Sequence, residues 1–264
     1  MHPTSSPDAA SVTLHIADGL ATLTLDYQAA NNAIGGRMRD ELPAALERLA
    51  AADARVGLIR ANGRMFCPGA DLNWLQPEAP GADDRVDQIL AELNPALAKL
   101  REAPKIIIAA VHGAVAGGGL GLMNVADLVI AADNARFATA YARIGLTPDL
   151  GASYWLPRLV GERRAMEMLL LADGFDAARA QALGLVNFVV PAADFETEVG
   201  KLVQRTLAGP PASYAAIKQL VYAAHDNSLP AQLQAEREQL VAATRRPEFT
   251  EGVRSFLEKR PPRY

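Results

Sequence analysis

Residues 106–132 read IIIAAVHGAVAGGGLGLMNVADLVIAA, and this stretch decides the fold. Ile106–Val111 is an uninterrupted apolar run, which is typical of a buried β-strand. A second apolar run follows at Leu128–Ala131. Five glycines lie between the two runs, three of them consecutive at 117–119, and they favour a turn. We therefore expect strand, turn, helix and strand in the core of an α/β protein.

The same stretch raises the question of a membrane span. Ile106–Ala126 contains 21 residues without Lys, Arg, Asp or Glu, which is long enough to cross a bilayer. The consecutive glycines near its middle favour the buried strand, turn and helix over one continuous helix. The first ten residues, MHPTSSPDAA, lack the basic start and apolar run of a signal peptide. The sequence therefore predicts a soluble cytoplasmic protein.

Strands and helices alternate on the N-terminal side of this stretch. Val12–Ile16 and Ala21–Leu25 alternate apolar and polar residues around Asp18-Gly19, which predicts a β-hairpin. The other elements expected here are a helix at 38–49 containing Pro43, a strand at 55–60, a surface loop at 77–87 and a helix at 90–100.

The character of the sequence changes after residue 192. Helical spacing predicts a helix at Phe195–Leu207, which Gly209-Pro210-Pro211 ends. Three further helices are expected at 213–224, 231–245 and 249–257. The predicted organisation is an α/β core over residues 1–192 and a helical C-terminal region over 193–264.

The composition restricts the chemistry. There are 26 Lys and Arg against 30 Asp and Glu, a formal charge of −4, which speaks against a nucleic-acid surface. The single Cys excludes a disulfide framework and multi-cysteine metal sites. No two of the four His have metal-ligand spacing, so no metal site is expected. Carboxylates, hydroxyls and backbone groups remain as the candidates for chemistry.

Two glycine-containing loops follow predicted strands. The first, at 63–72, reads GRMFCPGADL, and the second, at 111–121, reads VHGAVAGGGLG. Backbone N–H groups from two such loops can converge to form an oxyanion hole, although each loop alone is explained by a tight turn. Neither loop contains a phosphate-loop Lys, and the dinucleotide fingerprint G-x-G-x-x-G ends on Asn124. A nicotinamide dehydrogenase is therefore a weaker alternative.

Three ordered motifs resemble the enoyl-CoA hydratase/isomerase (crotonase) superfamily, and are most similar to the epoxyphenylacetyl-CoA isomerase type. They are FCPGADLNWL at 66–75, AVHGAVAGGGLGL at 110–122 and IGLTPDLGASYWLPRLVG at 144–161. The resemblance extends from about Asp18 to the C-terminal SFLEKR. It implies a spiral of ββα turns, with a helical C-terminal region that assembles homotrimers or hexamers.

The resemblance assigns an oxyanion hole to two residues. The backbone N–H groups of Ala70 and Gly118 would hold the thioester oxygen of an acyl-CoA while negative charge develops on it. Coenzyme A would enter as part of the substrate, so no separate cofactor is expected. The substrate-binding residues that it implies are Ala70, Asp71, Leu72, Gly117, Gly118, Tyr141, Phe256 and Lys259.

The two glutamates of the hydratases in this superfamily are missing. Their positions hold Gly121 and Tyr141, and the nearest acid is Asp149, where several isomerases of the superfamily carry an Asp. One carboxylate is enough to move a proton between two carbons of an acyl chain, and a buried carboxyl has the raised pKa that this needs. We therefore expect a double-bond isomerase that uses Asp149. The alternative role of Asp149 is to cap the following helix.

Three alternative activities remain open. Asp149 also matches the nucleophilic Asp of the 4-chlorobenzoyl-CoA dehalogenases of this superfamily, which form an aryl ester. Ordinary enoyl-CoA hydratase activity is disfavoured by the two missing glutamates. A member that binds coenzyme A without catalysis would bind acyl-CoA thioesters and turn none of them over.

Overall fold

The computed structural model describes residues 11–75, 78 and 80–264. Its centre is a six-stranded sheet in the order β1-β2-β3-β4-β6-β9, in which β1 and β2 are antiparallel and the other neighbours are parallel. A smaller sheet has the order β5-β7-β8. The strands are β1 Val12–Ala17, β2 Leu20–Leu25, β3 Val56–Ala61, β4 Ile106–Val111, β5 Ala114–Ala116, β6 Leu128–Ala132, β7 Arg136–Ala138, β8 Phe175–Asp176 and β9 Phe188–Val190.

The predicted hairpin and the three predicted core strands are confirmed. Asp18 and Gly19 join β1 to β2 with φ values of +50° and +77°. Positive φ at both central residues is what a two-residue hairpin turn requires. The strands expected at 55–60, 106–111 and 128–131 are β3, β4 and β6.

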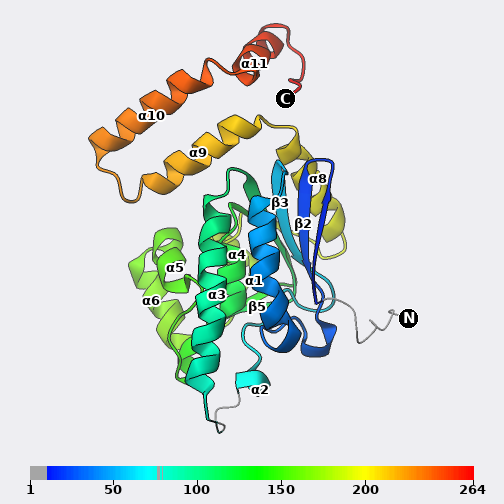
Figure 1. Ribbon diagram of the computed structural model, residues 1–264, viewed down its shortest axis with the longest axis vertical. Helices are drawn as coiled ribbons and strands as arrows, with labels where there is room; N and C mark the ends of the chain where they lie inside the picture. Colours follow the sequence, from blue (N-terminus) through cyan, green and yellow to red (C-terminus); the bar gives the residue numbers. More distant parts are fainter. Residues whose placement is uncertain (1–10, 76–77, 79) are drawn as a thin grey trace.

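Helices cover both faces of the large sheet (Figure 1). Leu23, Ile59 and Ile107 face α1 and α3, whereas Leu58 and Ile108 face α8. The helices are α1 Gly36–Ala51, α2 Leu72–Leu75, α3 Ala82–Glu102, α4 Gly118–Asn124, α5 Ala152–Val160, α6 Glu162–Leu171, α7 Ala177–Ala182, α8 Phe195–Leu207, α9 Pro211–Ala223, α10 Leu229–Ala243 and α11 Pro247–Leu257, with short 3₁₀ turns η1 Gln28–Ala30 and η2 Tyr141–Ile144.

The loop expected at 77–87 is shorter than predicted. Helix α3 begins at Ala82, so residues 82–87 belong to the helix, while residues 77 and 79 lie outside the described part of the chain. Asp83 and Asp84 occupy its first turn, where negative charge interacts favourably with the helix dipole. Two acids of the predicted loop thus belong to a helix N-terminus.

The last three helices extend beyond one end of the sheet (Figure 1). Helix α8 packs on the sheet through Phe195, Val199 and Val203, although it lies beyond the division predicted at residue 192. The helices that stand off the sheet therefore begin with α9. In the described residues, no helix has the length and apolarity needed to cross a membrane.

Candidate functional site

The two glycine loops are joined by hydrogen bonds. The N–H of Cys67 donates to the carbonyl of Ala114 at 3.1 Å, and the N–H of Ala116 donates to the carbonyl of Cys67 at 3.0 Å. A β-carbon on Gly69, which has a φ of +100°, would lie 2.9 Å from the Ala116 oxygen. Only glycine therefore allows the loops to approach this closely.

The pairing of the loops brings the segments that carry Ala70 and Gly118 together. A parallel bridge joins Cys67 to Val115, and a β-carbon on Gly117 would lie 3.7 Å from Cα of Gly69. Ile34 donates to the carbonyl of Gly69 and accepts from Asp71, which leaves the N–H of Ala70 unused. Gly118 is the first residue of α4. Within the described residues neither N–H has an acceptor in the chain, so both can donate to a bound oxygen.

The carboxyl of Asp149 lies beside this pair of donors. A β-carbon placed on Gly118 would be 3.9 Å from Oδ1 of Asp149. The hydroxyl of the buried Tyr141 donates to the same oxygen at 2.7 Å. Burial raises the pKa of Asp149 above its ordinary value, and the hydrogen bond from Tyr141 acts in the opposite direction. Burial and the nearby carboxylate also raise the pKa of Tyr141, so its hydroxyl keeps its proton.

Asp149 does not cap α5 with its side chain. The N-cap residue of α5 is Gly151, and only the backbone carbonyl of Asp149 accepts a bond, from the N–H of Ala152 at 2.8 Å. The carboxyl is therefore left for the contact with Tyr141. Side-chain capping of α5 is therefore not seen for Asp149, and its chemical role stays a prediction.

Leu150 fills the space where a hydratase of this superfamily would carry its first Glu. A β-carbon on Gly121 would lie 2.5 Å from Cβ and 2.6 Å from the carbonyl oxygen of Leu150. The glycine at 121 is thus required by the close packing of α4 against the Asp149–Leu150 segment. The second Glu position holds Tyr141, which is bonded to Asp149.

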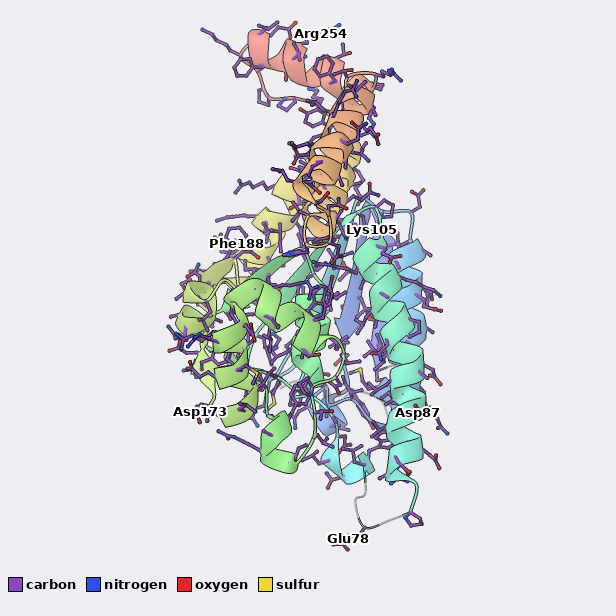
Figure 2. All side chains as sticks on the ribbon, turned by 90° about the vertical axis from the view of Figure 1, so that its left-hand side faces the viewer. Glu78, Asp87, Lys105, Asp173, Phe188 and Arg254 are labelled. Carbon is purple, nitrogen blue, oxygen red and sulfur yellow. The ribbon has the colours of Figure 1, made fainter. Side chains whose placement is uncertain are left out.

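Of the remaining predicted residues, Gly117 is the N-cap residue of α4 with a φ of +49°, and the others divide into two groups. Asp71 and Leu72 follow Ala70, and Oδ1 of Asp71 accepts from the N–H of Asn73 at 3.0 Å, so Asp71 orders the start of α2. Phe256 and Lys259 do not join the site within one chain, because α11 stands at the opposite end of the molecule from α2 (Figure 1). Figure 2 shows the same separation between Arg254 of α11 and Glu78.

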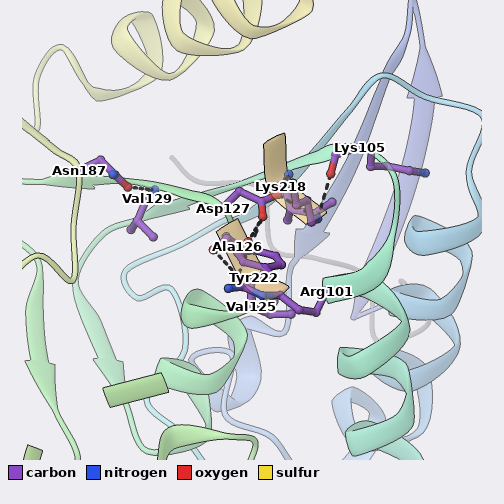
Figure 3. Close-up of polar contacts among 10 residues, drawn as sticks. Arg101, Lys105, Val125, Ala126, Asp127, Val129, Asn187, Lys218 and Tyr222 are labelled. Atoms are coloured by element: carbon purple, nitrogen blue, oxygen red, sulfur yellow. Dashed lines mark hydrogen bonds and ion pairs between the residues drawn. The ribbon is translucent and has the colours of Figure 1, made fainter. Parts of the chain in front are cut away.

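A cavity and a polar cluster next to the site were not predicted. The cavity, of about 490 Å³, is lined by Asp149 and by α3 and α5. The cluster joins Arg101 and Asp127 to Lys218 and Tyr222 of α9 (Figure 3). Lys218 is 6% exposed. Its position among apolar residues of a predicted helix was the sequence signal that could have indicated a buried lysine.

The fold and the site define a class of protein. It is a two-sheet α/β protein in which two glycine loops present, within the described residues, two N–H groups without an acceptor beside one half-buried carboxyl. The sequence profile described as "Enoyl-CoA hydratase/isomerase" matches residues 15–264. The chain therefore belongs to the enoyl-CoA hydratase/isomerase family, as its motifs predicted.

Individual relatives carry different activities in their names. "Probable enoyl-CoA hydratase" of Rhodobacter capsulatus is 41% identical over 96% of this chain and 97% of its own. The 1,2-epoxyphenylacetyl-CoA isomerase of Escherichia coli is 34% identical over 95% and 96%. The 4-chlorobenzoyl coenzyme A dehalogenase-1 of an Arthrobacter species is 32% identical over 92% and 88%.

A solved structure confirms the fold. The enoyl-CoA hydratase from Polaromonas sp. JS666 superimposes with a TM-score of 0.86 at 34% identity, over 96% of this chain and 99% of its own. The spiral α/β fold with a helical C-terminal region is thus the fold of the family.

Proposed function

We propose that the protein is an acyl-CoA double-bond isomerase in which Asp149 moves the proton. The observation that carries this proposal is the single half-buried carboxyl beside the Ala70 and Gly118 donors. A hydratase of this superfamily uses two glutamates, and here one of those positions has no room for a side chain. Proton transfer between two carbons needs only one acid–base group.

The proposed reaction has two steps. Asp149 takes a proton from a carbon of the acyl chain, and the electron pair moves towards the thioester oxygen to form an enolate. The N–H groups of Ala70 and Gly118 stabilise that oxygen, because fixed donors in a site shielded from water are strongest where charge develops. Asp149 then returns the proton two carbons away, which shifts the double bond. No atom is gained or lost.

Asp149→Asn tests this role. The amide cannot accept the proton, so turnover of 3-enoyl-CoA substrates should fall by about 10² to 10⁴-fold, the usual range for general acid–base catalysis. Binding of a saturated acyl-CoA should stay within about threefold, because the oxyanion donors are backbone groups. Asp173→Asn, at an exposed carboxyl, is the matched control. Turnover by Asp149→Asn equal to that of the control would exclude the mechanism.

A second candidate is a nucleophilic role for Asp149. The relative named 4-chlorobenzoyl coenzyme A dehalogenase-1 and the accessible carboxyl beside the oxyanion donors favour it. In that case Asp149 would attack the ring carbon bearing chlorine, chloride would leave, and water would hydrolyse the aryl ester. Incubation with 4-chlorobenzoyl-CoA followed by peptide mass spectrometry tests for an ester on Asp149. An unmodified Asp149 together with 3-enoyl-CoA turnover supports the isomerase.

The proposed assembly is a homotrimer or a hexamer. In one chain α11, which contains Phe256 and ends two residues before Lys259, stands at the opposite end of the molecule from α2, so contacts of these residues with coenzyme A would come from a neighbouring copy. The large exposed apolar residues of α10 and α11 support such an assembly; they include Leu229, Leu233, Leu240, Phe256 and Leu257. The cytoplasm is the proposed compartment.

A further inference from the structure

The cavity beside Asp149 has a charged far end. Its α3 wall runs from Leu90 to Arg101, a rise of about 16 Å along the helix. The cavity is also lined by the segment from Pro148 to Gly151 and by Tyr154 and Trp155 of α5. The Trp155 ring lies 4.4 Å from the Arg101 guanidinium. Because Trp155 is about one helical turn after Gly151, Arg101 lies at the end of the cavity that is farther from Asp149.

Arg101 is held in place while part of its guanidinium stays available. The guanidinium lies between the rings of Trp155 and Tyr222, 3.3 Å from the centre of the latter. Only Nη1 donates, to the carbonyls of Val125 and Ala126, and both distances are 3.4 Å. Among the described residues, Nε and Nη2 of Arg101 have no acceptor. The side chain is 21% exposed and lines the cavity.

The charges around Arg101 do not balance. Its nearest carboxylate oxygen, Oδ1 of Asp127, is 4.0 Å away. Asp127 already accepts from Lys218 Nζ at 3.0 Å, from the N–H of Ile107 at 2.7 Å and from the hydroxyl of Tyr222 (Figure 3). One buried carboxylate therefore serves both the buried Lys218 and the mostly buried Arg101. A buried cation without its own counter-ion is unfavourable, and an incoming anion relieves it.

The other polar groups of the cavity do not supply this anion. Asn94 is neutral and exposed. Glu102 also lines the cavity, but its exposed carboxyl makes no ion pair within the described residues, so it does not neutralise Arg101. The rest of the wall is apolar or aromatic and includes Leu90, Leu97, Leu150 and Tyr154. An apolar cavity that ends on a cation fits a chain with an acid at its tip.

We propose that the substrate is the monothioester of a dicarboxylic acid, whose free carboxylate binds Arg101 while the thioester lies at Ala70 and Gly118. This inference rests on the proposed function for the position of the thioester. Arg101 is then a specificity-determining residue that is remote from the reacting carbons. Its planar group, fixed between two rings, is suited to hold a carboxylate through two N–H bonds.

Equilibrium binding tests the inference without turnover. The ligands are saturated pairs of equal length: butyryl- and succinyl-CoA, hexanoyl- and adipoyl-CoA, octanoyl- and suberoyl-CoA. The wild-type protein should bind at least one dicarboxylic member about tenfold or more tightly than its neutral partner. Arg101→Gln should reduce that ratio to about one or below. Lys99→Gln, the same change at an exposed residue of α3, should keep it.

The ratio remains informative if Arg101→Gln is less stable, because both ligands are measured on the same folded protein, verified by its circular dichroism. Arg101→Lys provides a milder variant, for which we expect an intermediate ratio. A wild-type ratio near one for all three pairs, or a ratio that survives Arg101→Gln, would overturn the inference. Failure of the proposed function is seen separately, as absent turnover of every enoyl-CoA despite the binding preference.

Discussion

At the scale of single residues, the proposed function depends on how burial and one neighbour, Tyr141, set the protonation of Asp149. Burial raises the pKa of its carboxyl, since the charged form loses contact with water. The hydroxyl of Tyr141, which donates to Oδ1 at 2.7 Å, stabilises the charged form and limits that rise. The same contact fixes the direction of the carboxyl. Tyr141 is thus a positioning residue, and its effect should appear in the pH dependence.

Tyr141→Phe should move the acidic limb of the pH–rate profile to higher pH. The base must be ionised, so activity rises as pH passes through the pKa of Asp149. Loss of the hydroxyl raises that pKa further, because the carboxylate loses a hydrogen bond worth about 1.5–3 kcal/mol. Well below the limb, kcat/KM should fall by roughly tenfold or more, whereas at high pH it should approach the wild-type value. An unmoved limb would contradict this role of Tyr141.

Gly121 gives a second prediction at this scale. Gly121→Ala should lower the free energy of unfolding by about 1–3 kcal/mol, because its β-carbon would overlap Leu150. Gly200→Ala is the matched control, since no atom lies within 4 Å of a β-carbon there and the helix of α8 gains about 0.5–1 kcal/mol. Urea denaturation measures both. Equal stability of the two variants would show that α4 and Leu150 are not closely packed.

The sequence predicted which residues form the candidate site, but it did not predict the contacts between them. Asp149, Ala70 and Gly118 were assigned from short ordered motifs, in which glycines mark the turns and can be recognised from the local sequence. The bond from Tyr141 to Asp149 joins a 3₁₀ turn to the segment before α5, and nothing local encodes it. Likewise, the absence of Glu at position 121 was visible in the sequence, but its cause, contact with Leu150, required the structure.

At the scale of elements, the pattern of apolar residues predicted the long strands and the helices of the C-terminal region, but not the short strands β5, β7, β8 and β9 or the helices α6 and α7. It failed at the start of α3, where acids that stabilise a helix N-terminus looked like a surface loop. The pattern also could not predict which residue attaches α9 to the rest of the molecule. Lys218 donates to the carbonyl of Lys105 at 3.0 Å and to Asp127 at 3.0 Å, which fixes α9 to the ends of β4 and β6 (Figure 3). Such contacts join residues that are remote in sequence.

Asp127→Asn should weaken the attachment of α9 to the sheet. The change leaves Lys218 and Arg101 without a buried counter-ion, and breaking a buried pair costs about 3–5 kcal/mol. The control, Asp173→Asn, removes the partner of Arg143 in an exposed pair and should cost less than about 1 kcal/mol. Urea unfolding compares the two. Hydrogen exchange should also rise in α9 in the Asp127 variant, and equal losses in both variants would argue against the anchor.

At the scale of the whole molecule, the sequence predicted the α/β core and the helical C-terminal region, but not their arrangement. In one chain Ala70 lies just before α2, whereas α11 stands at the other end of the molecule (Figure 1). Helical spacing describes a helix face and says nothing of what covers it. Within the described part of α10 no residue is buried, and even the apolar Leu233 and Leu240 are 55% and 70% exposed. Another surface should therefore cover this helix.

Substitution of these leucines should release single chains. In sedimentation equilibrium we expect the wild type at three or six times the mass of one chain, and Leu233→Lys with Leu240→Lys at lower mass, because a buried charge opposes apolar association. Gln234→Lys with Gln239→Lys adds the same charge to polar positions of α10 and should keep the assembly. If Phe256 and Lys259 act across copies, the leucine variant should also bind acyl-CoA more weakly. A wild type that sediments as a single chain would remove the basis for both expectations.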